Sequence, residues 1–382
     1  MTGLLREIGT AALDELRAIR QDKAALTILV FAALFYAAIY PTPYKNQLAR
    51  EIPIVAVDLD GSATSRRLVR MVDATEQVAV GWVVPTMAEA EVLVHAEVAR
   101  GAVVIPETFE RSIQRGEQVV LGVFGDASYF MIYSQVASGI AQASGTLSAG
   151  IEIRRLQASG SDEARARKTR DPLPIALHPL YNPSGGYGNY IIPAVLVLIL
   201  QQTLLIGIGT LAGTRHESHG SIKKHSLAQC LGKALAYVSI YLVHAALFFT
   251  VVFRVFDLPH RGSLLRVLVF LFPFLLAVSF LGLTLSGLFR RRESALEGLM
   301  FTSLPAIFIS GFSFPKEAMP LWLQWGAHLL PSTDGIAGAL RIFQMDASLR
   351  EVQVPFLLLW GLSAVYFLTA WAVLSWGRPQ AD

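Results

Sequence analysis

The sequence predicts an α-helical membrane protein with six transmembrane helices and one α/β domain outside the membrane, between the first and second helices. Of its 382 residues, 53% are hydrophobic and only 16% are charged, and the mean hydropathy of +0.48 is too high for an ordinary soluble domain. A helix crosses the hydrocarbon with about 20 predominantly apolar residues. The stretches long enough to do so are Ala24–Tyr40, Tyr190–Ala212, Leu231–Phe253, Leu264–Phe289, Ala295–Phe314 and Val354–Trp376.

The first apolar stretch, residues 24–40, follows basic residues and could therefore be a signal peptide. No small-x-small cleavage site follows it, and Pro41-Thr42-Pro43 comes next, which is unlike a processing site. We interpret these residues as an uncleaved first transmembrane helix.

Residues 1–23 are expected to form an amphipathic helix on the inner membrane surface. Apolar residues recur there at three- and four-residue steps, with charged residues between them: Leu5, Ile8, Ala12, Leu16 and Ile19. A helix packed against a partner protein is an equally good interpretation, and the two are compatible.

The distribution of lysine and arginine predicts the orientation, because these residues gather at cytoplasmic helix ends. With six helices, one side receives Arg6, Arg17, Arg20, Lys23, Arg215, Lys223, Lys224, Lys233 and Arg290 to Arg292. Both termini are therefore expected in the cytoplasm, with residues 41–187 outside. Arg254, Arg261 and Arg266 would lie at outer helix ends, against this trend.

The outer segment, residues 41–187, alternates between strand and helix patterns, which predicts an α/β domain. Strands are expected at 52–60, 78–84, 102–105 and 119–124, and helices at 65–72, 86–100 and 106–115. A long helix is expected at 129–157, and the charged stretch 159–170 is expected to be mobile.

Two clusters resemble metal sites, but each has a simpler interpretation. Asp58, Asp60, Gly61 and Ser62 lack the remaining ligands of a calcium loop, so a capped turn between strand and helix is favoured. His216, Glu217 and His219, with His225 nearby, do not have the spacing of a zinc-protease motif. We predict no metal site.

The chain also lacks the motifs of the common catalytic classes. It contains no Gly-x-Ser-x-Gly, no P-loop and a single cysteine, Cys230. We therefore expect no enzymatic activity, no cofactor and no disulfide-held domain, and any energy for transport must come from another protein. The net charge of +3 follows the membrane topology and does not indicate nucleic-acid binding.

A few polar side chains occur inside the apolar stretches. Gln201, Gln202 and Thr203 lie in the second stretch and His244 in the third. Hydrogen bonding between helices is the simpler interpretation, and lining of a substrate path is the alternative. Gly209 and Gly213 form a Gly-x-x-x-Gly pair that permits close helix packing.

Several short motifs, in this order and spacing, resemble the ABC-2 type transporter permeases, in the branch with a large external domain. They are Val57 to Ser62, Ile105 to Phe109, Tyr181-Asn-Pro183, Tyr190-Ile-Ile-Pro193, the loop Arg215 to Gly220, Ser310-Gly-Phe-Ser-Phe-Pro315, Met319-Pro320 and Pro331. The loop after the second helix departs from the usual Arg-Glu-x-Gly-Thr, because it reads Arg215-His-Glu217-Ser-His-Gly220-Ser221.

The resemblance implies a partner ATPase subunit that holds ATP and Mg²⁺, and a coupling loop at residues 213–230 that docks into it. The residues of this loop that correspond to the family's motif are Arg215, Glu217, Gly220 and Ser221. Residues 1–23 would be the connecting helix beside the same interface. It also implies a re-entrant pair of short helices at 314–330 before the last span, marked by Gly311, Phe314, Pro315, Met319 and Pro320, within a membrane domain of residues 188–382.

The expected function is thus the membrane subunit of an ATP-driven exporter in a bacterial inner membrane. The path would lie between two permease chains, either copies or paralogues, and be lined by Gln201, Gln202, Thr203 and Ser310. Few buried charges favour an amphipathic or hydrophobic substrate such as a drug, lipid or secreted compound; membrane lipid and a periplasmic adaptor are further expected partners. The alternatives are a membrane-anchored binding or adhesion protein and an intramembrane enzyme.

Overall fold

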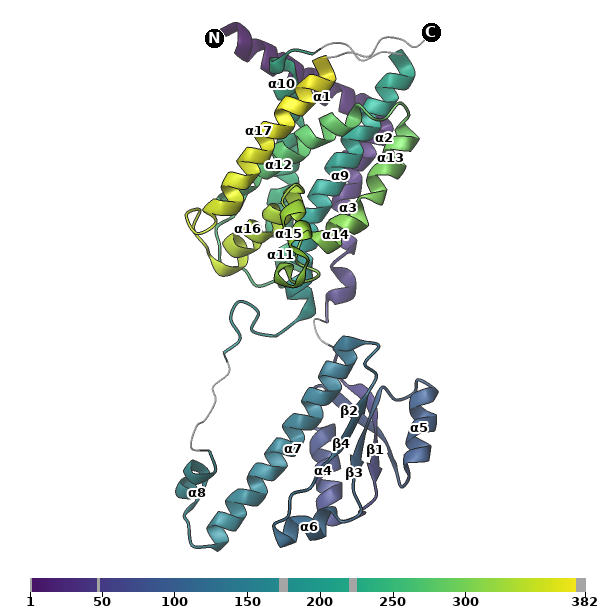
Figure 1. Ribbon diagram of the computed structural model, residues 1–382, viewed down its shortest axis with the longest axis vertical. Coiled ribbons are helices and arrows are strands. Elements are labelled where there is room, and N and C mark those ends of the chain that lie inside the picture. Colours follow the sequence, from purple (N-terminus) through teal and green to yellow (C-terminus); the bar gives the residue numbers. More distant parts are fainter. Residues whose placement is uncertain (1, 47–48, 172–177, 220–224, 376–382) are drawn as a thin grey trace. The chain divides into compact units, whose positions relative to one another are not determined.

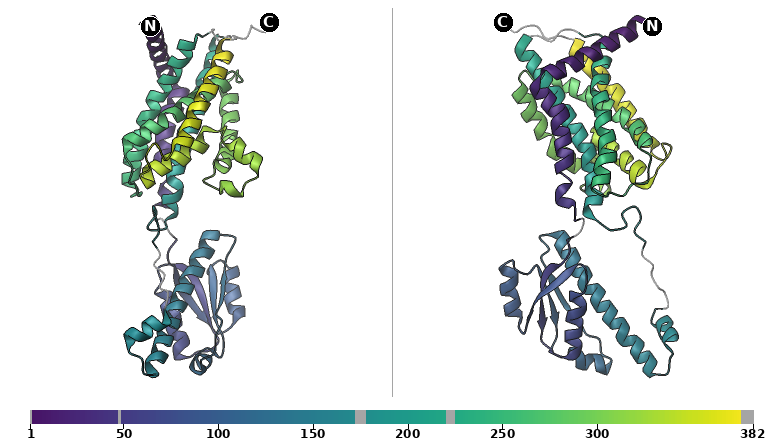
Figure 2. Two further views of the ribbon diagram at one scale, coloured as in Figure 1. Left: turned by 60° about the vertical axis from the view of Figure 1, so that its left-hand side comes forward. Right: turned by 180° about the vertical axis from the view of Figure 1, so that it is seen from behind.

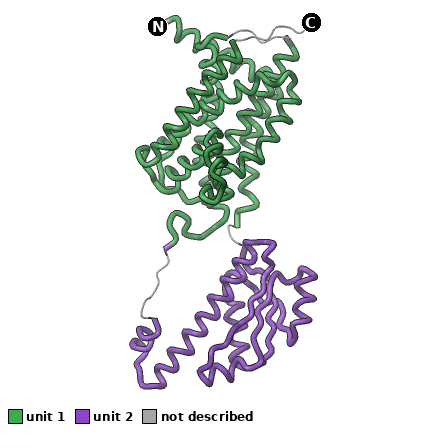
Figure 3. The backbone as a smooth tube through the Cα atoms, in the orientation of Figure 1, with its two compact units in different colours: residues 1–47, 179–382 green, residues 48–178 purple. Residues whose placement is uncertain are grey.

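The structure, a computed structural model, describes residues 2–46, 49–171, 178–219 and 225–375. It divides the chain into two compact units (Figure 3): unit 1 contains residues 1–47 and 179–382, and unit 2 contains residues 48–178. Each unit has a hydrophobic core of its own.

Unit 1 is entirely helical in its described residues, and five of its helices are long and apolar enough to cross a membrane. They cover Lys23–Tyr44, Tyr187–Ser218, Leu227–Val255, Leu264–Ser286 and Gln353–Ser375. Five of the predicted stretches are therefore confirmed as long apolar helices, each within a few residues of its expected ends. In Figure 1 they form α2 (Lys23–Leu26) with η1 (Thr27–Ala32), α3 (Ala33–Ile39) and η2 (Thr42–Tyr44), α9 (Tyr187–His219), α10 (Leu227–Leu247) with η3 (Phe248–Val252) and α11 (Phe253–Val255), α12 (Leu264–Ser286) and α17 (Gln353–Ser375).

The remaining predicted span, Ala295–Phe314, is not one continuous helix. The chain forms α13 (Arg292–Phe301) and α14 (Ser303–Ile309), separated at Thr302. Pro305 explains the break, because its ring would clash with the carbonyl of Phe301 if the helix continued. The count of six spans is therefore not confirmed.

Short helices fill the rest of unit 1. Residues 2–21 form α1 (Thr2–Gln21), and the segment between α14 and the last long helix contains η4 (Lys316–Ala318), α15 (Leu321–Ala327) and α16 (Pro331–Met345). Figures 1 and 2 show that α1 and the last turn of α17 lie at the same end of unit 1. The helix α12 is at its centre and packs against α9, α10, α16 and α17, and Gly335 and Gly338 on α16 make room for the rings of Phe274 and Phe270.

Unit 2 is an α/β domain, as predicted. Its sheet has the strand order β2-β1-β3-β4, in which β4 alone runs antiparallel to its neighbour. The strands are β1 (Ile52–Asp58), β2 (Val78–Val84), β3 (Gly101–Ile105) and β4 (Gly122–Gly125), and the helices are α4 (Ala63–Asp73), α5 (Met87–His95), α6 (Phe109–Arg115), α7 (Phe130–Ala158) and α8 (Glu163–Arg170). One face of the sheet packs against α4, α6 and α7, and the other against α5.

The long helix α7 confirms the prediction for residues 129–157, and the charged stretch after it contains a further helix. Residues 163–170 form α8 because Asp162 caps its first turn and Glu163 pairs with Arg167 at 2.6 Å. Such a pair one turn apart stabilises a helix on its exposed face.

Candidate functional site

A buried ion cluster joins three helices at the end of unit 1 that carries α1. Glu15 on α1 is only 2% exposed. Its two carboxylate oxygens accept hydrogen bonds from Nη1 and Nη2 of Arg215, near the end of α9, at 2.9 and 2.8 Å. Tyr237 on α10 donates its hydroxyl to the same carboxylate at 2.5 Å, and Lys233 Nζ lies 3.7 Å from it.

The cluster keeps Glu15 ionised despite its burial. Burial alone would raise the pKa of the Glu15 carboxyl, but the charges of Lys233 and Arg215, with hydrogen bonds from Arg215 and Tyr237, lower this pKa to about 2. A buried charge is tolerated when it is paired and its lone pairs are satisfied, and both conditions hold here. The ion cluster thus holds helices α1, α9 and α10 together.

A glycine allows α1 to approach α10 closely. A side chain at Gly232 would come within 2.5 Å of the Ile8 carbonyl oxygen and 2.8 Å of the Ala11 Cβ. Beside this contact, Ser226 donates its hydroxyl to Glu7 at 2.6 Å. Helix α1 therefore packs against α10 of the same chain, while Leu4, Leu5 and Leu13 remain exposed.

A cavity of about 610 Å³ opens beside the ion cluster. Its wall includes residues of α1, α9, α10, α12 and α17 together with His225. Burial and the neighbouring Lys233 lower the pKa of the His225 imidazole, which is therefore neutral at pH 7. Its Nε2 lies 3.2 Å from Lys233 Nζ and its Nδ1 lies 3.2 Å from Gln229 Oε1, so Nε2 accepts and Nδ1 donates.

The predicted coupling loop is described in part. Arg215 points into the ion cluster, and Glu217 accepts a hydrogen bond from the backbone N–H of Arg292 at 3.0 Å. Glu217 therefore satisfies a free N–H at the start of α13. Gly220 and Ser221 lie outside the described residues, and the role of all four in docking an ATPase stays a prediction.

The Gly-x-x-x-Gly pair on α9 serves helix packing. A Cβ at Gly213 would lie 2.5 Å from the Arg292 backbone nitrogen, and one at Gly209 would lie 2.6 Å from Leu299. The two glycines thus let α13 lie directly against α9, as the motif predicts.

The four predicted path residues have different surroundings. Gln201 is buried and exchanges two hydrogen bonds with Ser332 on α16, at 3.2 and 2.8 Å. Thr203 accepts a hydrogen bond from Tyr241 at 2.9 Å, and Ser310 donates to the Ile307 carbonyl at 2.8 Å. Both amide atoms of Gln202 are buried without a hydrogen-bond partner among the described residues. The contacts of Gln201 and Thr203 match the simpler interpretation of bonding between helices.

A left-handed turn precedes the segment predicted to be re-entrant, residues 314–330. Gly311 has φ +83°, a conformation that favours glycine, and Tyr190 donates its hydroxyl to the Phe312 carbonyl. Pro315 and Pro320 precede η4 and α15, Met319 is buried and Phe314 is half exposed. The residues are thus placed in short helices, but a hairpin that enters the membrane is not confirmed.

A second acid in unit 1 is buried near this segment. Asp334, in the first turn of α16, is 3% exposed, and its carboxylate lies 2.9 and 3.0 Å from Nδ1 of His328. The pair links the end of α15 to the start of α16.

In unit 2 the acidic cluster after β1 is a capped turn. Asp58 accepts backbone N–H groups of Asp60 and Gly61 and the hydroxyl of Ser65, and Ser62 caps α4. These bonds occupy the oxygens that a cation would need. Among the residues that the structure describes, no group of three histidine, cysteine or acidic side chains could hold a metal ion.

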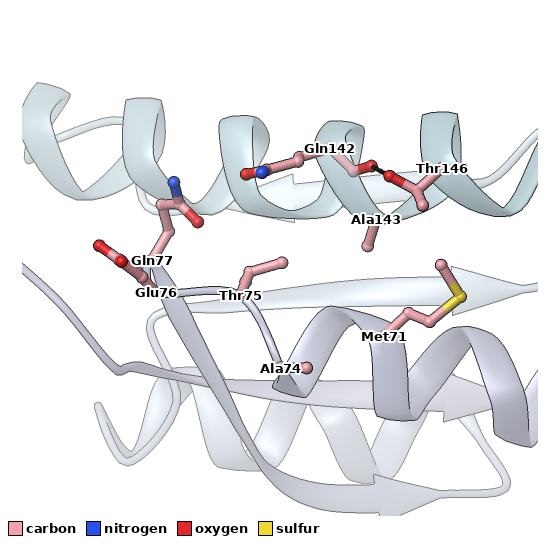
Figure 4. A pocket seen from close by; sticks show the side chains of 8 residues that line it. All are labelled: Met71, Ala74, Thr75, Glu76, Gln77, Gln142, Ala143 and Thr146. Atoms are coloured by element: carbon pink, nitrogen blue, oxygen red, sulfur yellow. Dashed lines mark hydrogen bonds between the residues drawn. The ribbon is translucent and has the colours of Figure 1, made fainter. Parts of the chain in front are cut away.

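Unit 2 also contains a shallow groove of about 380 Å³ between α4 and α7 (Figure 4). Met71 and Thr75 face Gln142 and Thr146 across it, and Gln77 lies at one end. Its wall offers neutral hydrogen-bonding groups and one carboxylate, Glu76, so it has the means to bind a polar group but no paired acid and base for catalysis.

Sequence reasoning missed Glu15, Lys233 and Tyr237 as a unit, and the His328–Asp334 pair. One signal was available: Glu15 falls three residues after Ala12 and four before Ile19, which places it on the apolar face of the first helix. An acid on that face must find a partner.

Comparison with known proteins agrees with this architecture. The family described as ABC-2 family transporter protein matches residues 23–372. The chain is 25% identical to the inner membrane transport permease YhhJ of Escherichia coli, over 96% of both chains. It is also 25% identical to the probable multidrug ABC transporter permease YbhR of Escherichia coli, over 45% of this chain and 48% of that one. A match of 25% identity to ABC transporter G family member 20 of Dictyostelium discoideum covers 55% of this chain and 30% of that one.

Five apolar helices that could span a bilayer, with an α/β unit between the first two of them in the chain, define a multi-spanning membrane protein. Because the family match covers most of its length, the chain belongs to the ABC-2 transporter family and is a membrane permease of an ABC transporter.

Proposed function

We propose that the chain is the membrane-spanning subunit of an exporter driven by a separate ATPase, which holds ATP and Mg²⁺. The observation that carries this proposal is the family match over residues 23–372, and the 382 residues of the sequence contain no P-loop. The relative named a probable multidrug ABC transporter permease supports an amphipathic or hydrophobic substrate, moved outward across a bacterial inner membrane. Both termini would then be cytoplasmic, as the arginine and lysine pattern predicts.

The ion cluster supports a mechanism by which movement of the coupling loop would be passed to the helices of unit 1. Arg215 lies near the end of α9, within the predicted coupling segment of residues 213–230, and Lys233 follows that segment on α10. Because Glu15 binds both side chains, a push on the loop moves α1, α9 and α10 together rather than bending one of them. Two permease chains would place the path at their shared surface. Gln202, whose buried amide atoms have no partner among the described residues, would contact that path if its side chain turned outward.

The further elements of the proposal concern the sixth span and the outer unit. We propose that α13 and α14 together supply the sixth crossing, and that η4 and α15 form the re-entrant pair, in which non-helical backbone is tolerated only when buried in protein or facing water. Unit 2 would face the periplasm and guide cargo or bind an adaptor.

The test is affinity purification of the tagged chain from membranes in mild detergent, with companions identified by mass spectrometry. A stoichiometric ATPase is expected with the unaltered protein, and a second permease chain would distinguish a heterodimer from a homodimer. If no ATPase is recovered under conditions that keep a known exporter complex intact, the transporter proposal fails and a membrane-anchored binding protein becomes the better interpretation.

A pair of variants separates docking from folding. Glu217→Gln keeps an oxygen that can accept the Arg292 N–H but removes the charge, whereas Glu217→Ala removes both. Loss of the ATPase from both variants, with unchanged melting temperatures for Glu217→Gln, would support a charged docking contact. Loss from Glu217→Ala alone would assign Glu217 to the capping of α13 and leave docking to other residues.

A further inference from the structure

The cavity beside Glu15 is lined by both apolar and polar side chains. Its lining includes the apolar residues Ile208, Ala212, Leu283 and Leu374, and it also includes the polar residues Arg215, Lys233 and Gln229. Its volume of about 610 Å³ is within the range of roughly 300 to 1,000 Å³ that is typical of sites for small molecules. An occupant that suits this wall has both an apolar and a polar part.

The polar residues of the lining carry an excess of positive charge. Glu15 is ionised and already accepts from Arg215 and Tyr237, so its oxygens are occupied. The other acid on the wall, Asp14, pairs with Arg17 at 2.9 Å and its side chain is 71% exposed. With His225 neutral, Arg215 and Lys233 together carry one more charge than Glu15 neutralises.

Both cations can also donate further hydrogen bonds. Arg215 uses one N–H on each terminal nitrogen for Glu15, and a guanidinium has further N–H groups to donate. Lys233 donates to His225 at 3.2 Å, and its ammonium can donate in other directions. An anionic group in the cavity would accept these hydrogen bonds and balance the excess charge.

We infer that this cavity binds an anionic phospholipid from the adjacent membrane leaflet, with its phosphate near Arg215 and Lys233 and an acyl chain against the apolar residues of the lining. Basic pockets between transmembrane helices commonly bind anionic headgroups at the cytoplasmic side. A free phosphate would gain the same charge contacts but would leave the apolar lining residues in water, which favours the lipid. The inference does not rest on transport activity or on the partner ATPase.

The experiment uses the full chain, purified in neutral detergent, with added phosphatidylglycerol, phosphatidylcholine or soluble glycerol 3-phosphate. Melting temperature and retention of lipid in native mass spectrometry are measured. Phosphatidylglycerol is expected to raise the melting temperature and remain bound, and the other two to do neither. Equal effects of the two lipids, or equal effects of glycerol 3-phosphate and phosphatidylglycerol, would overturn the inference.

Gln229→Glu tests the charge at the site without removing a structural bond. The Gln229 Oε1 caps α10 by accepting the Ser226 N–H at 3.2 Å, and a glutamate oxygen serves the same purpose in a capping box. The added negative charge should weaken phosphatidylglycerol binding by about tenfold. The matched control is Gln353→Glu at the exposed start of α17, which should leave binding unchanged.

Ala212→Phe tests the apolar part of the lining by filling the space beside it. Ala212 is partly exposed to the cavity, so the larger side chain occupies space that the acyl chain would need. Loss of retained phosphatidylglycerol at an unchanged melting temperature in detergent alone is the expected result. Undiminished retention in both Ala212→Phe and Gln229→Glu would show that the lipid binds elsewhere and would refute the assignment.

Discussion

Glu15 and Arg215 lie 200 positions apart in the sequence and form an ion pair with both carboxylate oxygens, at 2.9 and 2.8 Å. The pair is the only contact of its kind that we find between α1 and α9 among the described residues. Since Arg215 is near the end of α9 and within the predicted coupling loop of residues 213–230, the position of α1 depends on that of the loop.

We expect Glu15→Gln to lower the melting temperature of the protein at pH 7. The variant removes a buried carboxylate that three side chains bind and leaves two cations without their partner, which costs about 3 kcal/mol. The measurement is thermal unfolding in detergent. Asp14→Asn is the control on the same helix, because its surface pair with Arg17 should matter little.

The effect of Glu15→Gln should also depend on pH. The pKa of Glu15 falls from 4.5 when unfolded to about 2 when folded, so the folded protein binds the proton less readily. The stabilisation by the carboxylate is therefore complete above about pH 5 and is lost as the pH falls toward 2. The difference in melting temperature between the two proteins should narrow over that range; a constant difference would show that Glu15 is not the ionised group.

We expect Gly232→Ala to loosen α1 from α10. The added methyl group would lie 2.5 Å from the Ile8 carbonyl oxygen, closer than any normal contact, so the helices must separate. Trypsin should then cut faster after Arg17 and Arg20, and the melting temperature should fall. Gly361→Ala is the matched control on α17, where an added Cβ would have no atom of the described residues within 4 Å, and it should be neutral or stabilise by up to about 1 kcal/mol.

The structural elements that depend on neighbouring residues along the chain were predicted from the sequence. Apolar length alone located five membrane helices, and Leu264 is the observed first residue of α12. The strand-to-helix turn at Asp58 was also predicted, because capping is local. The start of β4 at Gly122 rather than Val119 was not, since strand ends depend on pairing with β3.

Long-range contacts account for the rest of what the sequence did not predict. The break at Thr302 is an exception, because Pro305 alone explains it and this proline is visible in the sequence. The partners of Glu15, by contrast, come from helices whose relative rotation no periodicity specifies. The same holds for Gln201, whose partner Ser332 is 131 residues away.

We expect Asp58→Ala to destabilise unit 2 by about 1 to 3 kcal/mol, because it leaves the N–H groups of Asp60 and Gly61 and the Ser65 hydroxyl without their acceptor. Unit 2 has its own cores, so a fragment of residues 48–178 can be unfolded by urea and followed by circular dichroism. Calcium and magnesium should not shift its stability. A cation-dependent shift that Asp58→Ala abolishes would contradict the capped-turn assignment and restore the metal-site interpretation.

Neighbouring glutamines on α9 should respond differently to the same substitution. Gln201→Leu removes the acceptor of the Ser332 N–H, which is buried, and should cost about 1 to 3 kcal/mol of stability. Gln202→Leu removes buried amide atoms that have no partner among the described residues, so stability should be unchanged or higher.

The comparison of stability with transport then tests the predicted path. If Gln202 contacts substrate or the second permease chain, Gln202→Leu should lower transport in membrane vesicles while its melting temperature holds, whereas Gln201→Leu should lower both together. Normal transport by Gln202→Leu would remove this residue from the path. A fall in melting temperature for Gln202→Leu equal to that for Gln201→Leu would mean that the amide of Gln202 has a partner within the chain, contrary to its observed surroundings.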